Sequence, residues 1–174
     1  MFRPSIQRIN VLVGLAMLCL ALYYIASSSI VTIVDQNYDL KVDSAKFMKN
    51  AVEFLKNEKG REYPLINRDP FDTRLIFYNE GSPILTDIGK FESKATVLKP
   101  NFSALIIDQL NRADVEEGDT IAVAMTGSMP GANIALLTAL KTMGINYVNI
   151  SSIGASSWGA VNPEFSWIHM EKIL

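Results

Sequence analysis

Hydrophobic and polar positions are distributed very unevenly along this chain. From Ile9 to Val34 the sequence runs for 26 consecutive residues without Asp, Glu, Lys, Arg or His. As a helix, that run would measure about 39 Å, which is enough to cross a hydrocarbon core of about 30 Å with some tilt. The pattern predicts a transmembrane anchor over residues 9–34.

The charges around the run predict its orientation. Arg3 and Arg8 precede it, and no acidic residue does. The positive-inside bias therefore places residues 1–8 in the cytoplasm and residues 35–174 outside it. We expect a single-pass protein of the cell (inner) membrane, with the lipid bilayer as its first partner.

A cleaved secretory signal is the alternative for the same segment. Residues 11–25 have the length of a signal core, and Ala26 to Ser28 offer small residues to a peptidase. A retained anchor is favoured because the apolar pattern resumes with Ile30 and continues to Val34, where a signal would have become polar.

Beyond the anchor, helical and strand patterns alternate. Apolar residues at spacings of three and four predict a helix over 43–58 and a second one beginning at Asn101, with Asn101 or Ser103 as its N-cap. A third helix begins near Pro130, with Ser128 as N-cap, and ends before Gly144. Uncharged runs predict strands over 75–78, 120–125 and 147–150.

This order of elements predicts the fold class. Helix, strand, helix, strand with short connections indicates an α/β domain with a parallel, Rossmann-like sheet and right-handed crossovers. Residues 35–174 are expected to form this one extracytoplasmic domain. The segment 81–100 is long for a connection and predicts either a surface hairpin or a lid loop containing Thr86, Asp87 and Lys94.

Two loops rich in small residues follow the last two predicted strands. In open parallel sheets, ligands bind at the carboxyl ends of neighbouring strands, and glycines allow the backbone to approach a ligand. Free N–H groups at a helix start favour an anion there. We expect the two loops to form one crevice for an anionic ligand, lined by Gly127, Ser128, Gly131, Asn133, Ser151, Ser152, Gly154, Ser156 and Trp158.

Catalysis is weakly supported by the sequence. Ser128 is the candidate nucleophile, but a hydrolase elbow needs small residues two positions away on each side, and Thr126 and Pro130 stand there. The candidate base, His169, is the one histidine of the sequence and lies in a predicted helix start. Binding by loop N–H groups requires fewer special residues and is favoured over an enzymatic function.

Composition excludes several other functions. The sequence holds one cysteine, Cys19, inside the apolar run, so it offers no Cys/His metal site and no disulfide within the chain. Arg3 and Arg8 are the charged residues before position 35, so the rest of the chain is acidic and does not suggest nucleic acid as a partner. Walker and dinucleotide fingerprints are absent, and no cofactor is expected.

Several runs resemble the bacterial poly-γ-glutamate system protein family. The similar segments are 99–106, 127–133, 151–160 and 162–167, of which the run around Trp158 is the most specific. The resemblance implies a membrane segment before an extracytoplasmic region, and a role alongside the machinery that makes and exports poly-γ-glutamate. Its synthase and export subunits are the implied partners.

The resemblance and the loop pattern both favour a site for an anion. Poly-γ-glutamate carries one free carboxylate per residue, so the expected function is that of an accessory component that binds such a group. Two alternatives stay open: an extracytoplasmic hydrolase of γ-glutamyl or peptide bonds that uses Ser128, and a structural scaffold subunit.

The anchor is predicted to be retained in the mature protein. The uncharged run continues to Val34, further than a signal core needs. Mass spectrometry of the mature chain is expected to find the original N-terminus, and a start near Ser29 would contradict the prediction.

Residues 35–174, expressed alone, are predicted to self-associate or to pack loosely. Few strands are predicted, parallel sheets need cover on both faces, and the last apolar stripe, Trp167 to Leu174, reaches the end of the sequence. The expected cover is either a continuation of the chain or an oligomeric partner, including a second copy. Light scattering tests this, and a monomer with one sharp unfolding transition is the opposing result.

Overall fold

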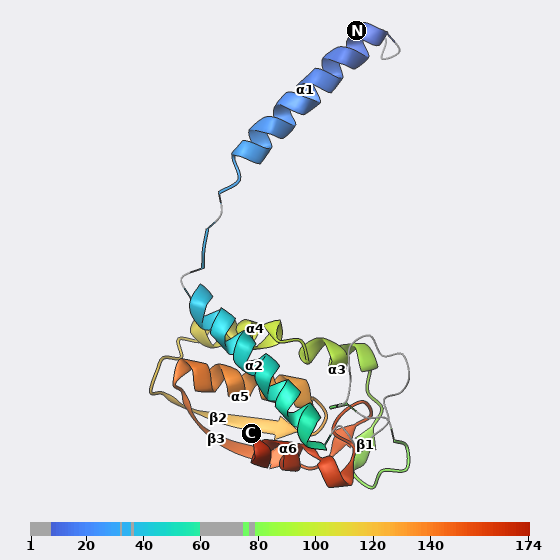
Figure 1. The fold of residues 1–174 in the computed structure, drawn as a ribbon, viewed down its shortest axis with the longest axis vertical. Helices are drawn as coiled ribbons and strands as arrows, with labels where there is room; N and C mark the ends of the chain where they lie inside the picture. Colours follow the sequence, from blue (N-terminus) through green and yellow to red (C-terminus); the bar gives the residue numbers. More distant parts are fainter. Residues whose placement is uncertain (1–7, 32, 36, 60–74, 77–78) are drawn as a thin grey trace. The chain divides into compact units, whose positions relative to one another are not determined.

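The computed structural model describes residues 8–31, 33–35, 37–59, 75–76 and 79–174. Contacts within the chain divide it into two units, Met1–Gln36 and Asn37–Leu174, which are treated separately below. Figure 1 shows the elements of each unit and their labels.

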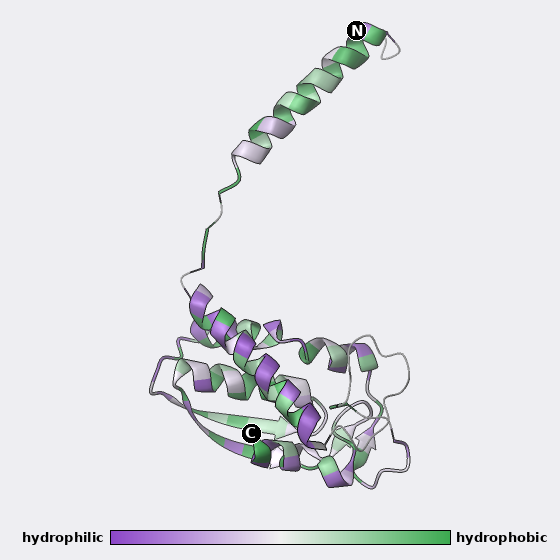
Figure 2. Ribbon diagram, viewed as in Figure 1, coloured by the Kyte–Doolittle hydropathy of each residue, from purple (hydrophilic) through white to green (hydrophobic). Residues whose placement is uncertain are grey.

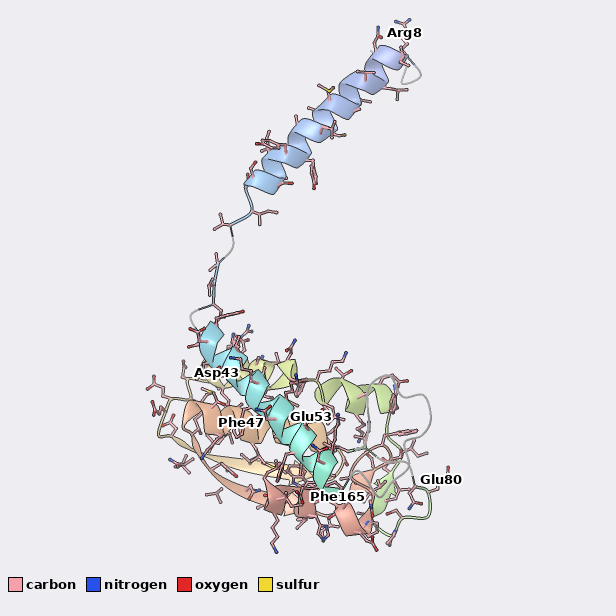
Figure 3. The ribbon with its side chains drawn as sticks, viewed as in Figure 1. Arg8, Asp43, Phe47, Glu53, Glu80 and Phe165 are labelled. Atoms are coloured by element: carbon pink, nitrogen blue, oxygen red, sulfur yellow. The ribbon has the colours of Figure 1, made fainter. Side chains whose placement is uncertain are left out.

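The first unit contains the apolar helix α1, which spans Ile9–Ser28. Its mean hydropathy is 2.2 and none of its residues is buried, and Figure 2 shows hydrophobic residues along most of its length. Side chains project from it on all sides beyond Arg8 (Figure 3). Among the described residues it is the one helix that is long and apolar enough to cross a membrane.

Helix α1 ends six residues before the end of the predicted anchor, 9–34. The hydroxyls of Ser28 and Ser29 donate to the carbonyls of Tyr24 and Ile25, at 2.5 and 2.7 Å. Serine competes in this way for backbone groups, and the β-branched residues that follow are poor helix formers. At 20 residues the helix would measure about 30 Å, which still matches a bilayer core.

The second unit is a mixed α/β structure with two short parallel strand pairs, β2–β3 and β1–β4. Its elements are α2 (Tyr38–Lys59), β1 (Leu85–Asp87), α3 (Phe91–Val97), α4 (Asn101–Arg112), β2 (Thr120–Thr126), α5 (Pro130–Met143), β3 (Asn146–Ser152), β4 (Ala155–Ser156), the 3-10 turn η1 (Pro163–Phe165) and α6 (Trp167–Ile173).

The core forms where α2, α4 and α5 pack together on one side of the β2–β3 pair (Figure 1). Alternate residues of β2, including Val123 and Met125, pack against these helices, as expected for a strand with a side-chain period of two. Met48 and Leu55 of α2 and Trp167 of α6 are fully buried in the same cluster. This packing confirms the apolar stripe that the sequence predicted for α2.

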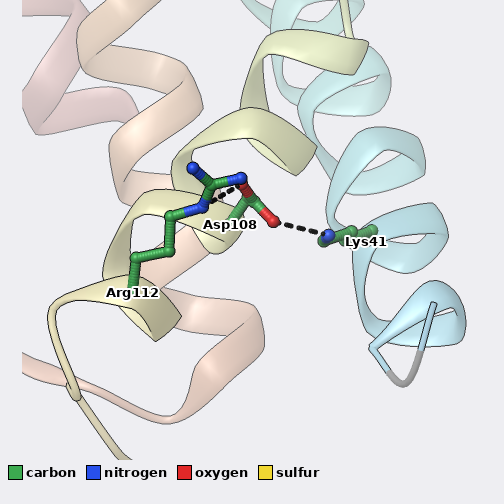
Figure 4. Close-up of polar contacts among 3 residues, drawn as sticks. All are labelled: Lys41, Asp108 and Arg112. Atoms are coloured by element: carbon green, nitrogen blue, oxygen red, sulfur yellow. Dashed lines mark hydrogen bonds and ion pairs between the residues drawn. The ribbon is translucent and has the colours of Figure 1, made fainter.

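An ion-pair network joins α2 to α4. Asp108 accepts from Lys41 at 3.0 Å through one carboxylate oxygen and from Arg112 at 2.9 Å through the other (Figure 4). Asp108 and Arg112 are one helical turn apart, and Lys41 comes from the neighbouring helix. The carboxylate therefore bridges the two elements near the surface of the domain.

A chain of buried hydroxyls lies deeper between the three packed helices. Ser44 of α2 contacts Ser103 of α4, and Ser103 contacts Thr138 of α5 at 3.0 Å. Thr138 also donates to the carbonyl of Ile134 at 2.9 Å. Each of these three hydroxyls has a hydrogen-bond partner, which removes most of the cost of burying polar groups among apolar ones.

The other face of the β2–β3 pair is exposed. Ala122 pairs in register with Val148, and Ala124 with Ile150. Val148 is 66% and Ile150 is 78% exposed. Among the described residues β2 pairs with β3 alone. The expectation that this sheet needs further cover stays a prediction.

The strand and loop predictions before α4 need correction. Leu75 and Ile76 are buried but do not form a strand, and residues 77–78 lie outside the described part. The segment 81–100 is not a connection without structure, because it contains β1 and α3. Because β1 and α3 are short and bury few side chains, the polar composition of the segment did not predict them.

Several predicted ends differ in detail. Helix α4 begins after Pro100 without a side-chain cap, since Ser103 turns into the buried hydroxyl chain instead. The residue capping α5 is Met129 rather than Ser128, although Pro130 and the left-handed Gly144 (φ 69°) bound the helix as predicted. The segment that begins at Pro163 is a 3-10 turn, and α6 begins after Ser166.

Gly131→Ala is predicted to destabilise the domain by about 1–3 kcal/mol, the usual cost of overpacking. A Cβ at Gly131 would lie 2.8 Å from the backbone of Val97 and Leu98, so α5 would be pushed away from the end of α3. Urea unfolding of the full chain in detergent micelles, followed by tryptophan fluorescence, measures the change.

Gly81→Ala is the matched control, because its nearest neighbour, Asn79 Oδ1, would be 3.6 Å away. Without a clash, this substitution should leave stability unchanged or slightly increased. Equal unfolding midpoints for the two variants would contradict close contact between α5 and α3.

Candidate functional site

The loops that follow β2 and β3 touch each other through their backbones. Gly127 accepts a hydrogen bond from the N–H of Ala160 at 2.8 Å and donates to the carbonyl of Gly154 at 3.2 Å. A Cβ at Gly159 would lie 2.5 Å from the Gly127 oxygen, so the contact requires glycine. The predicted proximity of the two loops is therefore present in the structure.

A lysine and two serines meet at this contact. The N–H of Ser156 donates to Ser128 Oγ at 3.0 Å, and Lys94 Nζ donates to Ser156 Oγ at 2.7 Å. Lys94 Nζ also donates to the backbone carbonyl of Ser128. We refer to these three residues as the Lys94 cluster; they come from α3, from the loop after β2 and from β4.

Lys94 is buried, with 4% of its surface exposed. Burial lowers the pKa of its amine from the ordinary value of 10.5, because the charged form loses hydration. Within the described residues no carboxylate forms an ion pair with it. In the described part of the chain, the ammonium form of this buried amine is therefore stabilised by hydrogen-bond dipoles alone.

Both serine hydroxyls in the cluster have a proton left to donate. Ser128 Oγ accepts from the Ser156 N–H, and Ser156 Oγ accepts from Lys94, but neither hydroxyl donates to another described residue. Both serines are partly exposed, whereas Lys94 is not. The two serines therefore keep one hydroxyl donor each, beside an amine that is buried.

Neighbouring contacts hold this arrangement in place. The N–H of Ser157 donates to the Asp87 carbonyl at 2.9 Å, and Gly89 N–H donates to Ser157 Oγ at 2.7 Å. Phe91 and Trp158 meet edge to face with their ring centroids 5.1 Å apart. These contacts fix β1 and the start of α3 against the loop after β3.

The expected lid residues consequently have other positions. Thr86 and Asp87 are exposed residues of strand β1, paired in parallel with β4. Lys94 lies in a helix and is buried beneath the loops it was expected to cover. The segment is a fixed part of the domain and supplies the one charged residue of the cluster.

Other predicted site residues lie outside the cluster. Ser151 Oγ donates to Glu171 at 2.5 Å and accepts from the Trp167 indole at 3.3 Å, so it joins β3 to α6. Asn133 donates to the Thr126 carbonyl at 2.8 Å, and Ser152 is exposed at the end of β3. The nine predicted residues are thus divided between the cluster, its supporting backbone and separate structural contacts.

His169 has a different role from that of the candidate base. It is exposed on α6, and its Nδ1 lies 2.9 Å from Ser166 Oγ in a capping box. A capping box satisfies backbone groups at a helix start, which explains the residue without chemistry. The structure shows no contact between His169 and Ser128.

A separate open groove of about 830 Å³ runs between α2, α5, α6 and β3. Its lining includes the exposed aromatic residues Phe47 and Phe54 and the α6 residues Glu171 and Ile173. Figure 3 shows Phe47 on α2. No residue of the Lys94 cluster lines this groove.

The sequence pattern predicts Lys94 in a lid loop and does not connect it to Ser128 and Ser156. One signal was available: Lys94 is three residues after Phe91 and four before Leu98, so a helix would place it on an apolar face. A lysine on such a face is either buried with hydrogen-bond partners for its amine, or the helix is interrupted there and the lysine is exposed. The pairing with Ser128 and Ser156 depends on tertiary contacts that no spacing encodes.

Comparison with known proteins adds no further constraint. No protein family model, no curated protein and no solved structure matches this chain.

Proposed function

We propose that this chain is a membrane-anchored accessory component of poly-γ-glutamate synthesis or export, and that the Lys94 cluster binds a carboxylate. In this proposal α1 spans the inner membrane once, with residues 1–8 in the cytoplasm. The α/β unit then lies outside the cytoplasm. The synthase and export subunits are its proposed partners.

The burial of the Lys94 amine is the observation that carries the binding proposal. An ammonium removed from water is stabilised by an opposite charge and by hydrogen bonds, and the described residues supply only the hydrogen bonds. A ligand carboxylate could accept from the hydroxyls of Ser128 and Ser156 and would add the missing negative charge. Hydrogen bonds that involve ionised groups are shorter and stronger than neutral ones.

Poly-γ-glutamate suits a site of this size. The cluster offers one amine and two hydroxyls, enough for one carboxylate rather than a row of them. The formal net charge of the chain is −2, so a long electrostatic groove for a polyanion is not favoured. The proposed mode is the capture of a single carboxylate of the polymer.

We also infer that the exposed face of the β2–β3 pair is covered in the assembled protein. A β2–α5–β3 unit with parallel strands is the repeating part of a Rossmann-like sheet, and its uncovered face holds Val148 and Ile150. Cover by a further part of the chain, by a second copy or by a synthase subunit would complete it. This inference is supported by the exposure of that face.

Lys94→Met is predicted to weaken the binding of a γ-linked glutamate tetramer by at least about tenfold. Methionine keeps the length of the side chain but removes the positive charge that attracts the carboxylate, and a loss of about 1.4 kcal/mol corresponds to tenfold in affinity. Ser128→Ala should lose less, because it removes one neutral donor. Isothermal titration calorimetry of the full chain in detergent micelles measures both.

Two controls accompany this titration. Lys90→Met removes an exposed lysine beside the same helix and should leave the affinity unchanged. A tetramer in which each α-carboxylate is replaced by a carboxamide should bind at least tenfold more weakly than the acid. Equal affinity for the two tetramers, or no effect of Lys94→Met, would contradict carboxylate binding at the cluster.

A further inference from the structure

The contact between Ser156 and Lys94 carries a second role, beyond binding. Lys94 Nζ lies 2.7 Å from Ser156 Oγ, within the range for direct proton transfer between a hydroxyl and an amine. We propose that Ser156 is the nucleophile of an acyl-transfer centre, with Lys94 as its general base and an ester or amide carbonyl as its substrate. The sequence had suggested Ser128 with His169 for such chemistry.

The geometry favours Ser156 over Ser128 as the nucleophile. Ser156 is held by strand β4, by its own N–H to Ser128 Oγ and by the bond from Gly159 N–H to its carbonyl at 2.9 Å. Its hydroxyl is the one that Lys94 contacts, since Lys94 reaches Ser128 only at the backbone carbonyl. Ser156 is also partly exposed, whereas Lys94 is buried.

The proposed reaction balances without a further reactant except water. As Ser156 Oγ attacks the carbonyl carbon, its proton passes to the Lys94 amine and the carbonyl electron pair moves onto oxygen. Collapse breaks the bond to the leaving alcohol or amine, which takes that proton from Lys94. Water then attacks the acyl-serine, and its proton returns through Lys94 to Ser156 Oγ as a carboxylic acid is released.

Ser128 supplies stabilisation for the developing oxyanion. Its hydroxyl accepts from the Ser156 N–H and keeps its own proton for a neighbouring oxygen. A hydroxyl donor near the position where negative charge develops lowers the barrier, and loss of such a donor slows acyl transfer by about a hundredfold or more. Ser128 is thus assigned to the oxyanion and Ser156 to the attack.

The two roles of the cluster need opposite charge states of Lys94. Carboxylate binding requires the ammonium, and acyl transfer requires the free amine. Burial lowers the pKa of Lys94 below the ordinary value of 10.5, so a larger fraction of its amine is uncharged at any given pH. The elements packed around Lys94 carry four other charged residues, all exposed: Asp87 in β1, Lys90 just before α3, Glu92 in α3 and Lys141 in the last turn of α5. None of these four forms an ion pair with Lys94. The loops around 128 and 156 and the start of α5 carry no charge.

The test uses p-nitrophenyl acetate and the full chain in detergent micelles. We expect release of nitrophenolate together with an acetyl group on Ser156, mapped by mass spectrometry, and an acylation rate that increases as the pH rises through the pKa of Lys94. Ser156→Ala should abolish the mapped acetyl group. Lys94→Arg should slow acylation by at least about a hundredfold, because the guanidinium does not act as a base near neutral pH.

Lys94→Arg also separates this role from carboxylate binding. Arginine keeps the positive charge, so binding of the glutamate tetramer should be retained within a few fold while acylation is lost. Ser93→Ala, which removes the exposed serine next to Lys94, is the control for both measurements. Wild-type chain without an acetyl group on Ser156, or acylation unchanged by Lys94→Arg, would overturn the proposal and leave Lys94 as a structural clamp between α3 and the loops.

Discussion

The backbone contact between Gly127 and the segment 154–160 is the constraint on which the candidate site depends. It joins the loops after β2 and β3 through two hydrogen bonds and leaves no room for a side chain at Gly159. With the loops held together, the N–H of Ser156 reaches Ser128 Oγ, and a single amine from α3 reaches both loops. Placement of the three groups is therefore a property of backbone packing rather than of flexible side chains.

The site's electrostatics follow from where its lysine comes from. Lys94 belongs to helix α3, where Glu92 and the preceding residue Lys90 are exposed, while the Lys94 side chain is buried beneath the loops. The start of α5 and both loops are uncharged, so the amine has no fixed counter-ion among the described residues. Such an amine can respond in two ways, by attracting an anion or by giving up its proton, and the pH decides which response prevails.

Sequence patterns predicted the regular elements well where many apolar residues share one period. The spacing of apolar residues and the residues at the element ends predicted the helix around Met48, the strand that contains Met125 and the helix between Pro130 and Gly144. Short elements such as β1 and α3 bury few residues, so their pattern was too weak to distinguish from a loop. The meeting of the two loops followed from parallel pairing, but the position of Lys94 depends on contacts between residues more than thirty positions apart.

The buried hydroxyl chain from Ser44 through Ser103 to Thr138 has a consequence for how the three core helices can be arranged. Apolar contacts alone would tolerate sliding one helix along another by a turn, since one aliphatic surface can replace another. A slide of that kind would leave a hydroxyl without a partner in a dry interior, at a cost of about 1–3 kcal/mol for each group. The three hydroxyls add little net stability. They select one axial register of α2, α4 and α5 over registers in which a helix is displaced by a turn.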